Sequence, residues 1–175
     1  TAIQIASELL STSSDGLGII LGGITGVPPT KVVILGGGTV AEYAARAAFG
    51  MGADVKIFDN HIYKLGRIKH ALNFPVYTST IDTDLLARAL ASTDVFIGAL
   101  RPDKGRNRIV VTEAMVENMK EGSVILDLSI DQGGCVETSS MTTLERPTFK
   151  KHGVIHYCVP NVTSRVARTA SMALS

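Results

Sequence analysis

The sequence VVILGGGTVA, from Val32 to Ala41, decides the fold. Its first four residues are a continuous apolar run, which is typical of a strand buried on both faces of a parallel sheet. The six residues that follow fit the pattern G-x-G-x-x-A, which is a weak signal on its own. Here the pattern comes directly after a buried strand and opens a helical stretch. This context predicts a turn that binds the phosphates of a dinucleotide. The alternative is a merely flexible turn.

Each residue type in this turn has a physical reason. Gly36 permits the tight turn, and Gly38 lets backbone N–H groups approach a pyrophosphate that a side chain would block. Ala41 lets the helix pack close to the strand. Thr39 and Val40 begin the helix, whose N-terminus carries the partial positive charge that favours phosphate. We therefore expect Gly36, Gly38, Thr39, Val40 and Ala41 to bind cofactor.

An acidic residue follows at the distance that this kind of site requires. Asp59 ends the next apolar run, where a carboxylate accepts hydrogen bonds from the ribose hydroxyls of adenosine. It also repels a 2′-phosphate, so the sequence predicts NAD rather than NADP. The alternative role for Asp59 is to cap the helix that follows. Lys64, one helical turn further, is within reach of the same ribose, or is simply a solvated surface charge.

Short apolar strands alternate with helices along the rest of the chain. The expected helices cover residues 2–10, 40–51, 62–72, 84–91 and 166–174, with another capped by Thr112; the expected strands cover 32–35, 55–58, 76–78, 95–97, 124–128 and 155–159. The pattern predicts an α/β fold with a doubly wound, mostly parallel, six-stranded sheet of the Rossmann kind. Ligands of such sheets bind beyond the carboxyl ends of the strands. In the helix at 40–51 we expect the buried face to hold Val40, Ala44, Ala47, Ala48 and Met51.

A length of 175 residues suits one domain. We expect residues 1–30 to form a leading helix and a Gly/Pro-rich flap, packed with a main body over 31–175. The chain opens with Thr1 rather than Met, and its last helix meets no stop signal before Ser175. These two features predict a piece of a longer protein.

Composition excludes several other classes of protein. The net charge is only +1 and Trp is absent, so we expect no nucleic-acid partner. No run of about 20 apolar residues occurs and no signal peptide precedes the first helix, so we expect no membrane span and a cytoplasmic location. Cys135 and Cys158 have no CxxC partner and should be free, packed thiols; His156 should be a hydrogen-bonded core histidine. We predict no metal site.

Several segments resemble the NAD-binding domain of alanine dehydrogenases. They are IDQGGC (130–135), HYCVPN (156–161), the flap LGGITGV (21–27) and MKEGSVILD (119–127), and the resemblance covers nearly the whole chain. It implies that L-alanine, NAD and water give pyruvate, ammonium and NADH. Family members commonly form hexamers, so the resemblance also implies a homo-oligomeric parent protein.

The resemblance implies roles for residues after the later strands. Ala99 and Leu100 would pack on the cofactor, and Ile130 would lie by the nicotinamide. Asp131 would face the reacting carbon, where a carboxylate can accept a proton or orient ammonia and water. Val159 and Asn161 would line the same cleft, with Asn161 contacting nicotinamide or substrate. A loop aspartate that caps backbone N–H groups and a turn asparagine are the alternatives for Asp131 and Asn161.

The chain departs from the family pattern in three places. After the asparagine turn stands Val162-Thr163-Ser164, where the family often has Pro-Gly or a similar pair. Ser139-Ser140-Met141 stands where an arginine is common. No segment matches the separate domain whose lysine and histidine bind the substrate carboxylate in this family. We therefore expect the piece to bind cofactor but to be inactive alone.

Other functions remain open at this point. They are the NAD(H)-binding component of a proton-translocating transhydrogenase, which Asp131 disfavours, a non-catalytic NAD-sensing module, and a saccharopine dehydrogenase. The basic cluster at 101–108 is either a mobile solvated loop or a contact with a neighbouring domain or subunit.

Overall fold

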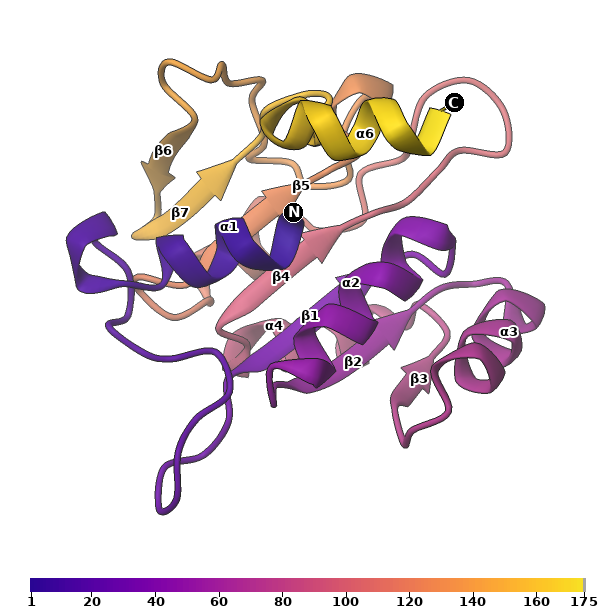
Figure 1. Cartoon of the computed structure of the whole chain (residues 1–175), viewed down its shortest axis with the longest axis horizontal. Coiled ribbons are helices and arrows are strands. Elements are labelled where there is room, and N and C mark those ends of the chain that lie inside the picture. The colour runs from indigo at the N-terminus through magenta and orange to yellow at the C-terminus, as the bar shows by residue number, and fades with distance from the viewer. Residues whose placement is uncertain (175) are drawn as a thin grey trace.

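The computed structural model describes residues 1–174. A single sheet has the strand order β3-β2-β1-β4-β5-β7-β6 (Figure 1). The strands are β1 (Lys31–Leu35), β2 (Asp54–Phe58), β3 (Tyr77–Ser79), β4 (Val95–Gly98), β5 (Val124–Asp127), β6 (Thr148–Lys151) and β7 (Val154–Tyr157). The helices are α1 (Ala2–Leu9), α2 (Thr39–Gly50), α3 (Ile62–Leu72), α4 (Thr83–Ser92), α5 (Glu113–Glu117) and α6 (Ala167–Leu174), with 3-10 turns η1 (Thr12–Ser14), η2 (Ile130–Gln132) and η3 (Val162–Val166).

The doubly wound α/β fold is confirmed, but the prediction of six strands was wrong. All six expected strands form, and a seventh, β6, pairs antiparallel with β7 at the edge of the sheet. Its sequence, Thr148-Phe149-Lys150-Lys151, is half-exposed and polar, so it lacks the apolar run of a central strand. Lysines are typical of edge strands, where they discourage pairing with another chain.

The sheet buries both faces, as its apolar strands predict. Along β1, Val32 and Ile34 face α1, α2 and α3, whereas Val33 and Leu35 face α4 and α5. Figure 1 shows α1 and α2 crossing the near face, with α4 behind the strands. Strand β1 lies between β2 and β4, parallel to both. The chain therefore turns in opposite directions on the two sides of β1, and a crevice opens at its carboxyl end.

Helix α2 presents a narrower face to the sheet than expected. Its buried residues are all alanines: Ala41, Ala44, Ala45 and Ala48. The expectation for Val40, Ala47 and Met51 was wrong, because all three are exposed. Small side chains let the helix axis approach the strands closely, which holds its N-terminus beside the glycine turn.

Within residues 1–30, helix α1 packs against the main body and a later hairpin projects away from it. Ile3, Ile5 and Ala6 of α1 join the core, as does Leu21. The segment from 22 to 29 then projects as a hairpin with one bridge, between Ile24 and Val27 (Figure 1).

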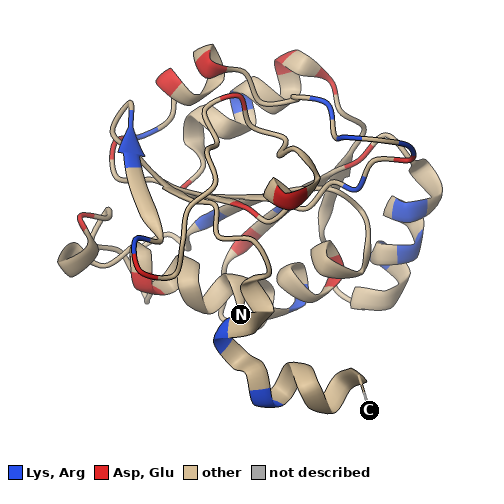
Figure 2. Cartoon of the chain, turned by 90° about the horizontal axis from the view of Figure 1, so that it is seen from above, with Lys and Arg blue, Asp and Glu red and all other residues tan. Residues whose placement is uncertain are grey.

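The other end of the chain also leaves the body. In Figure 2, α6 extends away from it, and none of the described α6 residues is buried. Among residues 1–174, no helix is long and apolar enough to span a membrane.

Candidate functional site

The glycine turn between β1 and α2 is built by close backbone contacts. Gly36 has φ +123°, and a Cβ there would lie 2.5 Å from the carbonyl oxygen of Ala99, so only glycine fits. Its N–H donates to the carbonyl of Phe58 at 2.7 Å. Gly38 caps α2 in an extended conformation, and a Cβ added to it would meet nothing within 4 Å. The backbone at Gly38 therefore faces open space at the positive end of a helix.

Asp59 is buried directly beside this turn. One carboxylate oxygen, Oδ2, accepts the N–H of Gly37 at 2.6 Å. The other, Oδ1, accepts the N–H of His61 at 2.7 Å and contacts His61 Nδ1 at 2.9 Å. A carboxylate offers roughly four acceptor positions, so Asp59 holds the local backbone and still has capacity for a ribose hydroxyl. Asp59 does not cap α3, whose N-cap residue is His61, but it binds the N–H of the N-cap residue and that of Gly37.

Two residues that sequence reasoning missed also hold the turn. Arg67 on α3 donates to the carbonyl of Gly37 at 3.1 Å and pairs with Glu42 on α2 at 2.6 Å. The hydrogen bond from Arg67 is the main reason that the pKa of Glu42 lies below its ordinary value. No sequence pattern marks this arginine, because it lies 30 positions from its glycine partner.

A cavity of about 370 Å³ opens on the β3 side of the turn. Asp59, His61 and Leu100 line it, together with the loop at 101–108. His61 bridges the two parts, because its Nε2 lies 3.5 Å from Oδ2 of Asp103 in that loop. The loop brings four cations to the same cavity: Arg101, Lys104, Arg106 and Arg108.

A smaller cavity, of about 100 Å³, lies on the β5 side. Val40, Ala99, Leu100 and Asp131 all line it, so the structure brings these four predicted residues together. Leu100 and Arg101 line both cavities, which are therefore neighbours.

The other predicted site residues lie outside these two cavities. Val159 is buried in the core. Asn161 is exposed with φ +52°, and its Oδ1 accepts the hydroxyl of Thr163 at 2.7 Å, as expected of a turn asparagine. Lys64 is half-exposed on the first turn of α3, close to Gly37. Ile130 is half-buried on η2, against Gly134.

The groups expected to be inert are buried. Burial raises the pKa of both thiols, Cys135 and Cys158, which stay protonated. His156 is buried, with Nδ1 2.8 Å from the carbonyl oxygen of Val154 and Nε2 2.7 Å from the hydroxyl of Thr138. Its prediction as a hydrogen-bonded core histidine is confirmed.

One surface cluster has metal-ligand residue types. Glu113, Glu117 and His152 bring their ligand atoms within 4.8 Å of one another. His152 Nε2 already contacts Glu113 Oε1 at 2.8 Å, and the ammonium of Lys151 lies 3.4 Å from the same oxygen. The cluster is an exposed ion-pair network.

Comparisons with known proteins find relatives over nearly the whole chain. The alanine dehydrogenases of Halomonas elongata and Bacillus subtilis are 40% and 42% identical, each over 99% of this chain. The chain spans 47% and 46% of their respective lengths, about half of each. A solved L-alanine dehydrogenase has a TM-score of 0.95 at 41% identity, covering 99% of this chain and 48% of that one.

A transhydrogenase from Sinorhizobium meliloti is less similar. It has a TM-score of 0.71 at 28% identity, covering 83% of this chain and 41% of that one. The family model described as "Alanine dehydrogenase/PNT, C-terminal domain" matches residues 2–175. The chain therefore belongs to the family of alanine dehydrogenase/PNT C-terminal domains.

Proposed function

We propose that this chain is the NAD(H)-binding half of an L-alanine dehydrogenase. The observation that carries the proposal is one constellation at the crevice: the open backbone at Gly38, the buried carboxylate of Asp59 beside it, and Asp131 across the neighbouring cavity. Relatives that bear the name alanine dehydrogenase support it at 40–42% identity. NAD is the cofactor of this domain, since the residues that hold its phosphates and ribose in such folds are all present.

The crevice divides the cofactor between its two cavities. The N-terminus of α2, at Gly38, Thr39 and Val40, would bind the pyrophosphate through backbone N–H groups. Asp59 would accept the adenosine ribose hydroxyls, and Lys64 is close enough to help. The cavity at Asp59 therefore suits adenosine, and the cavity at Asp131 suits nicotinamide.

The nicotinamide-side residues have separate tasks in the proposed reaction. NAD, when bound, supplies the hydride acceptor. Ala99 and Leu100, which line the cavity at Asp131, would offer apolar contact to a flat ring and exclude water from it. Ile130 would add to this contact from the adjoining η2. Asp131 is exposed at the mouth, where its carboxylate can take a proton from the substrate amine or from attacking water. Val159 lies in the core and Asn161 lies outside both cavities, so neither is given a task in the proposed reaction.

The partners of the whole protein follow from the same proposal. The lysine and histidine that bind the carboxylate of alanine or pyruvate would belong to the remaining half of the longer protein. That protein would be a cytoplasmic homo-oligomer, a hexamer by resemblance to its family.

Alanine oxidation by the protein expressed from the complete reading frame tests this proposal. We expect alanine-dependent formation of NADH, and a loss of roughly 100-fold or more in kcat for Asp131→Asn, because removal of a proton-transfer group costs about 10²–10⁴ in rate. The 175-residue chain alone should bind NADH without oxidising alanine. Alanine oxidation at full rate by the chain alone, or by Asp131→Asn, would contradict the proposal.

The transhydrogenase-like alternative has one specific observation in its favour, the structural likeness to the Sinorhizobium meliloti protein. A complete reading frame that joins this chain to membrane-spanning transhydrogenase subunits, with no alanine oxidation, would favour it.

A further inference from the structure

The carboxylate of Asp127 has no role in the proposed function, although it is fully buried at the carboxyl end of β5. Two of its hydrogen bonds come from the start of the next loop: Oδ1 accepts the N–H of Ser129 at 3.2 Å and its hydroxyl at 2.8 Å. Four come from the end of the loop and the residues just after it. Oδ2 accepts the N–H of Cys135 at 3.0 Å, the N–H of Val136 at 3.4 Å and the hydroxyl of Ser139 at 2.8 Å, and Oδ1 accepts the thiol of Cys135 at 3.7 Å. One carboxylate thus closes the loop 129–135 on itself.

This carboxylate is held by neutral donors. No lysine or arginine within residues 1–174 forms an ion pair with Asp127. A buried charge without a cation is costly unless hydrogen bonds compensate, so the donors around it must stay in place. Two glycines leave room for these donors to approach the carboxylate. A Cβ on Gly134 would lie 2.9 Å from Oδ2 of Asp127, and a Cβ on Gly98 would clash with the sulfur of Cys135.

The closed loop carries the two residues, Ile130 and Asp131, that the proposed function assigns to the nicotinamide side. Ile130 and Asp131 lie on η2, between the two ends that Asp127 ties together. Within the loop, the N–H groups of Gln132 and Gly134 both donate to the carbonyl of Ser129 at 2.9 Å. The N–H of Asn107 also donates to the carbonyl of Gln132 at 2.9 Å, so the loop 101–108 supports η2 from outside. The two ends tied by Asp127 hold the loop at its base.

We propose that Asp127 is the positioning residue for the nicotinamide side of the site. It acts through Ser129 and Cys135 to set where Ile130 and Asp131 stand, and it touches neither cofactor nor substrate. This inference rests on the proposed function, because it assigns the loop 129–135 to the nicotinamide half of NAD.

The proposal predicts which part of the cofactor loses affinity. An asparagine at 127 has one acceptor oxygen, and its NH₂ group would face N–H groups at one end of the loop. That end should detach and η2 should move. The glycine turn and Asp59 follow other strands, β1 and β2, and should keep their positions.

The experiment is a calorimetric titration of the 175-residue chain with NADH and with ADP-ribose, which lacks only the nicotinamide ring. For Asp127→Asn we expect NADH to bind roughly tenfold more weakly, as loss of a charged hydrogen bond predicts, and ADP-ribose to change by less than about twofold. Equal losses for the two ligands, or no loss for either, would overturn the positioning role.

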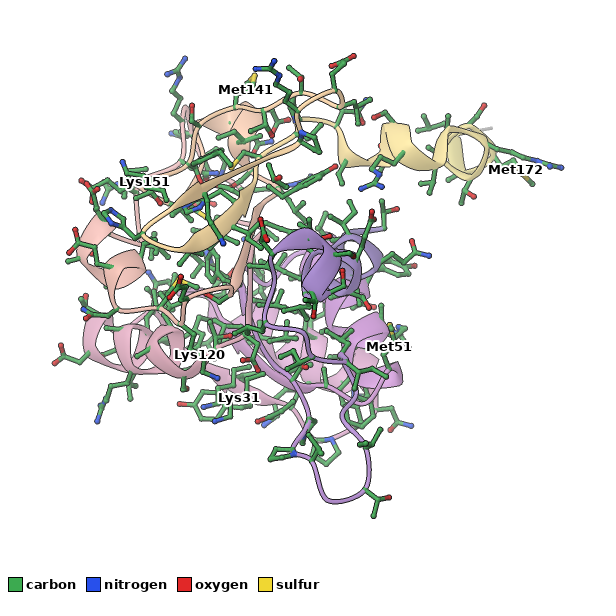
Figure 3. All side chains as sticks on the ribbon, turned by 90° about the vertical axis from the view of Figure 1, so that its left-hand side faces the viewer. Lys31, Met51, Lys120, Met141, Lys151 and Met172 are labelled. Atoms are coloured by element: carbon green, nitrogen blue, oxygen red, sulfur yellow. The ribbon has the colours of Figure 1, made fainter. Side chains whose placement is uncertain are left out.

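A matched control separates position from stability. Asp94 is also a buried aspartate, next to β4, but it lies at the amino ends of the strands. Its carboxylate accepts the N–H of Lys31 at 2.8 Å and pairs with Lys120 at 2.8 Å, and Figure 3 labels both lysines on the same side of the molecule. Asp94→Asn should lower the melting temperature and leave the ratio of the two affinities unchanged.

A second variant and the result for the wild type distinguish failure of this inference from failure of the proposed function. If Asp127→Asn does not fold, Ser129→Ala removes one hydroxyl donor from the same carboxylate, and the same selective loss for NADH, about threefold, is expected. A wild-type chain that binds neither ligand would overturn the proposed function, and this inference with it. A wild type that binds both, with variants that alter both equally, would overturn only the inference.

Discussion

At the scale of single residues, Asp59 joins two functions in one side chain. It fixes the glycine turn through Gly37, and it offers its remaining acceptor capacity to the crevice. His61 holds its other oxygen and reaches Asp103 across the larger cavity. The carboxylate proposed to bind ribose is therefore already oriented by protein contacts.

Replacement of Asp59 should weaken cofactor binding. We expect NADH to bind to Asp59→Ala roughly tenfold more weakly, because a charged acceptor for the ribose is lost and the turn loosens. NADH fluorescence measures this directly. Asp54→Ala, at the exposed amino end of the same strand, is the matched control and should bind like the wild type. Unchanged affinity in Asp59→Ala would remove the ribose assignment.

His156 gives the fold a pH dependence. Burial lowers the pKa of His156 below its ordinary value, more than the hydrogen bond to the carbonyl of Val154 raises it. Because the carbonyl of Val154 can only accept, Nδ1 carries the proton of the neutral ring. Nε2 then accepts the hydroxyl of Thr138, and protonation of Nε2 would break that hydrogen bond. The unfolded chain therefore binds this proton more readily than the folded chain. Stability from His156 is complete above pH about 6.5 and falls as the pH drops below that value.

The free energy of unfolding, measured by urea titration between pH 7.5 and 5, tests this sign. We expect His156→Asn to be less stable at pH 7.5 but to lose less stability on acidification, by up to about 1.4 kcal/mol per pH unit. His70→Asn, on the exposed side of α3, serves as the control. A wild-type slope that persists in His156→Asn would show that other groups cause it.

At the scale of elements, helix α4 shows how local chemistry sets a boundary. Asp82 precedes the helix in an extended conformation, and its side chain accepts the N–H of Leu85 at 2.9 Å. This satisfies one of the unpaired donors of the first turn. The apolar residues Leu86, Ala89 and Leu90 then pack against the sheet.

Loss of this cap should destabilise the domain modestly. Asp82→Ala should lower the free energy of unfolding by about 1 kcal/mol, as N-cap replacements do. Asp84→Ala, in the first turn but without the cap hydrogen bond, should lower it by less, about 0.3–0.5 kcal/mol. Chemical denaturation with both variants decides the matter; equal losses would mean that charge near the helix end matters more than the hydrogen bond.

The elements that sequence predicts best are those whose pattern is local. The glycine turn and its flanking strand and helix lie within the twenty consecutive residues Lys31–Gly50, and Ile62–Leu72 matches its expected bounds. β6 was not predicted because Phe149 is its one large apolar residue. The turn that joins it to its pairing partner, β7, passes through His152 with φ +53°, and a histidine is not among the residues that usually mark such a turn.

In the site, too, local patterns were predicted and contacts between distant residues were not. Val40, Ala99, Leu100 and Asp131 meet at one cavity because parallel strands end at one edge of the sheet, which the strand order implies. The contacts of Arg67 and the closure of a loop by Asp127 depend on tertiary packing and on hydrogen bonds between side chains and backbone. No spacing rule in the sequence encodes them.

At the scale of the whole molecule, the chain presents a built cofactor crevice and spans about half the length of its alanine dehydrogenase relatives. The two cavities lie side by side at the carboxyl end of the sheet, since Leu100 and Arg101 line both. Helix α6 and the 22–29 hairpin leave the body at other points. The arrangement suits a domain that holds NAD.

A calorimetric titration of the chain with NADH and NADPH tests the assignment of the crevice to NAD most directly. We expect one NADH per chain, bound roughly tenfold or more tightly than NADPH, because the carboxylate of Asp59 repels a 2′-phosphate. Failure to bind NADH, or equal affinity for NADPH, would contradict it.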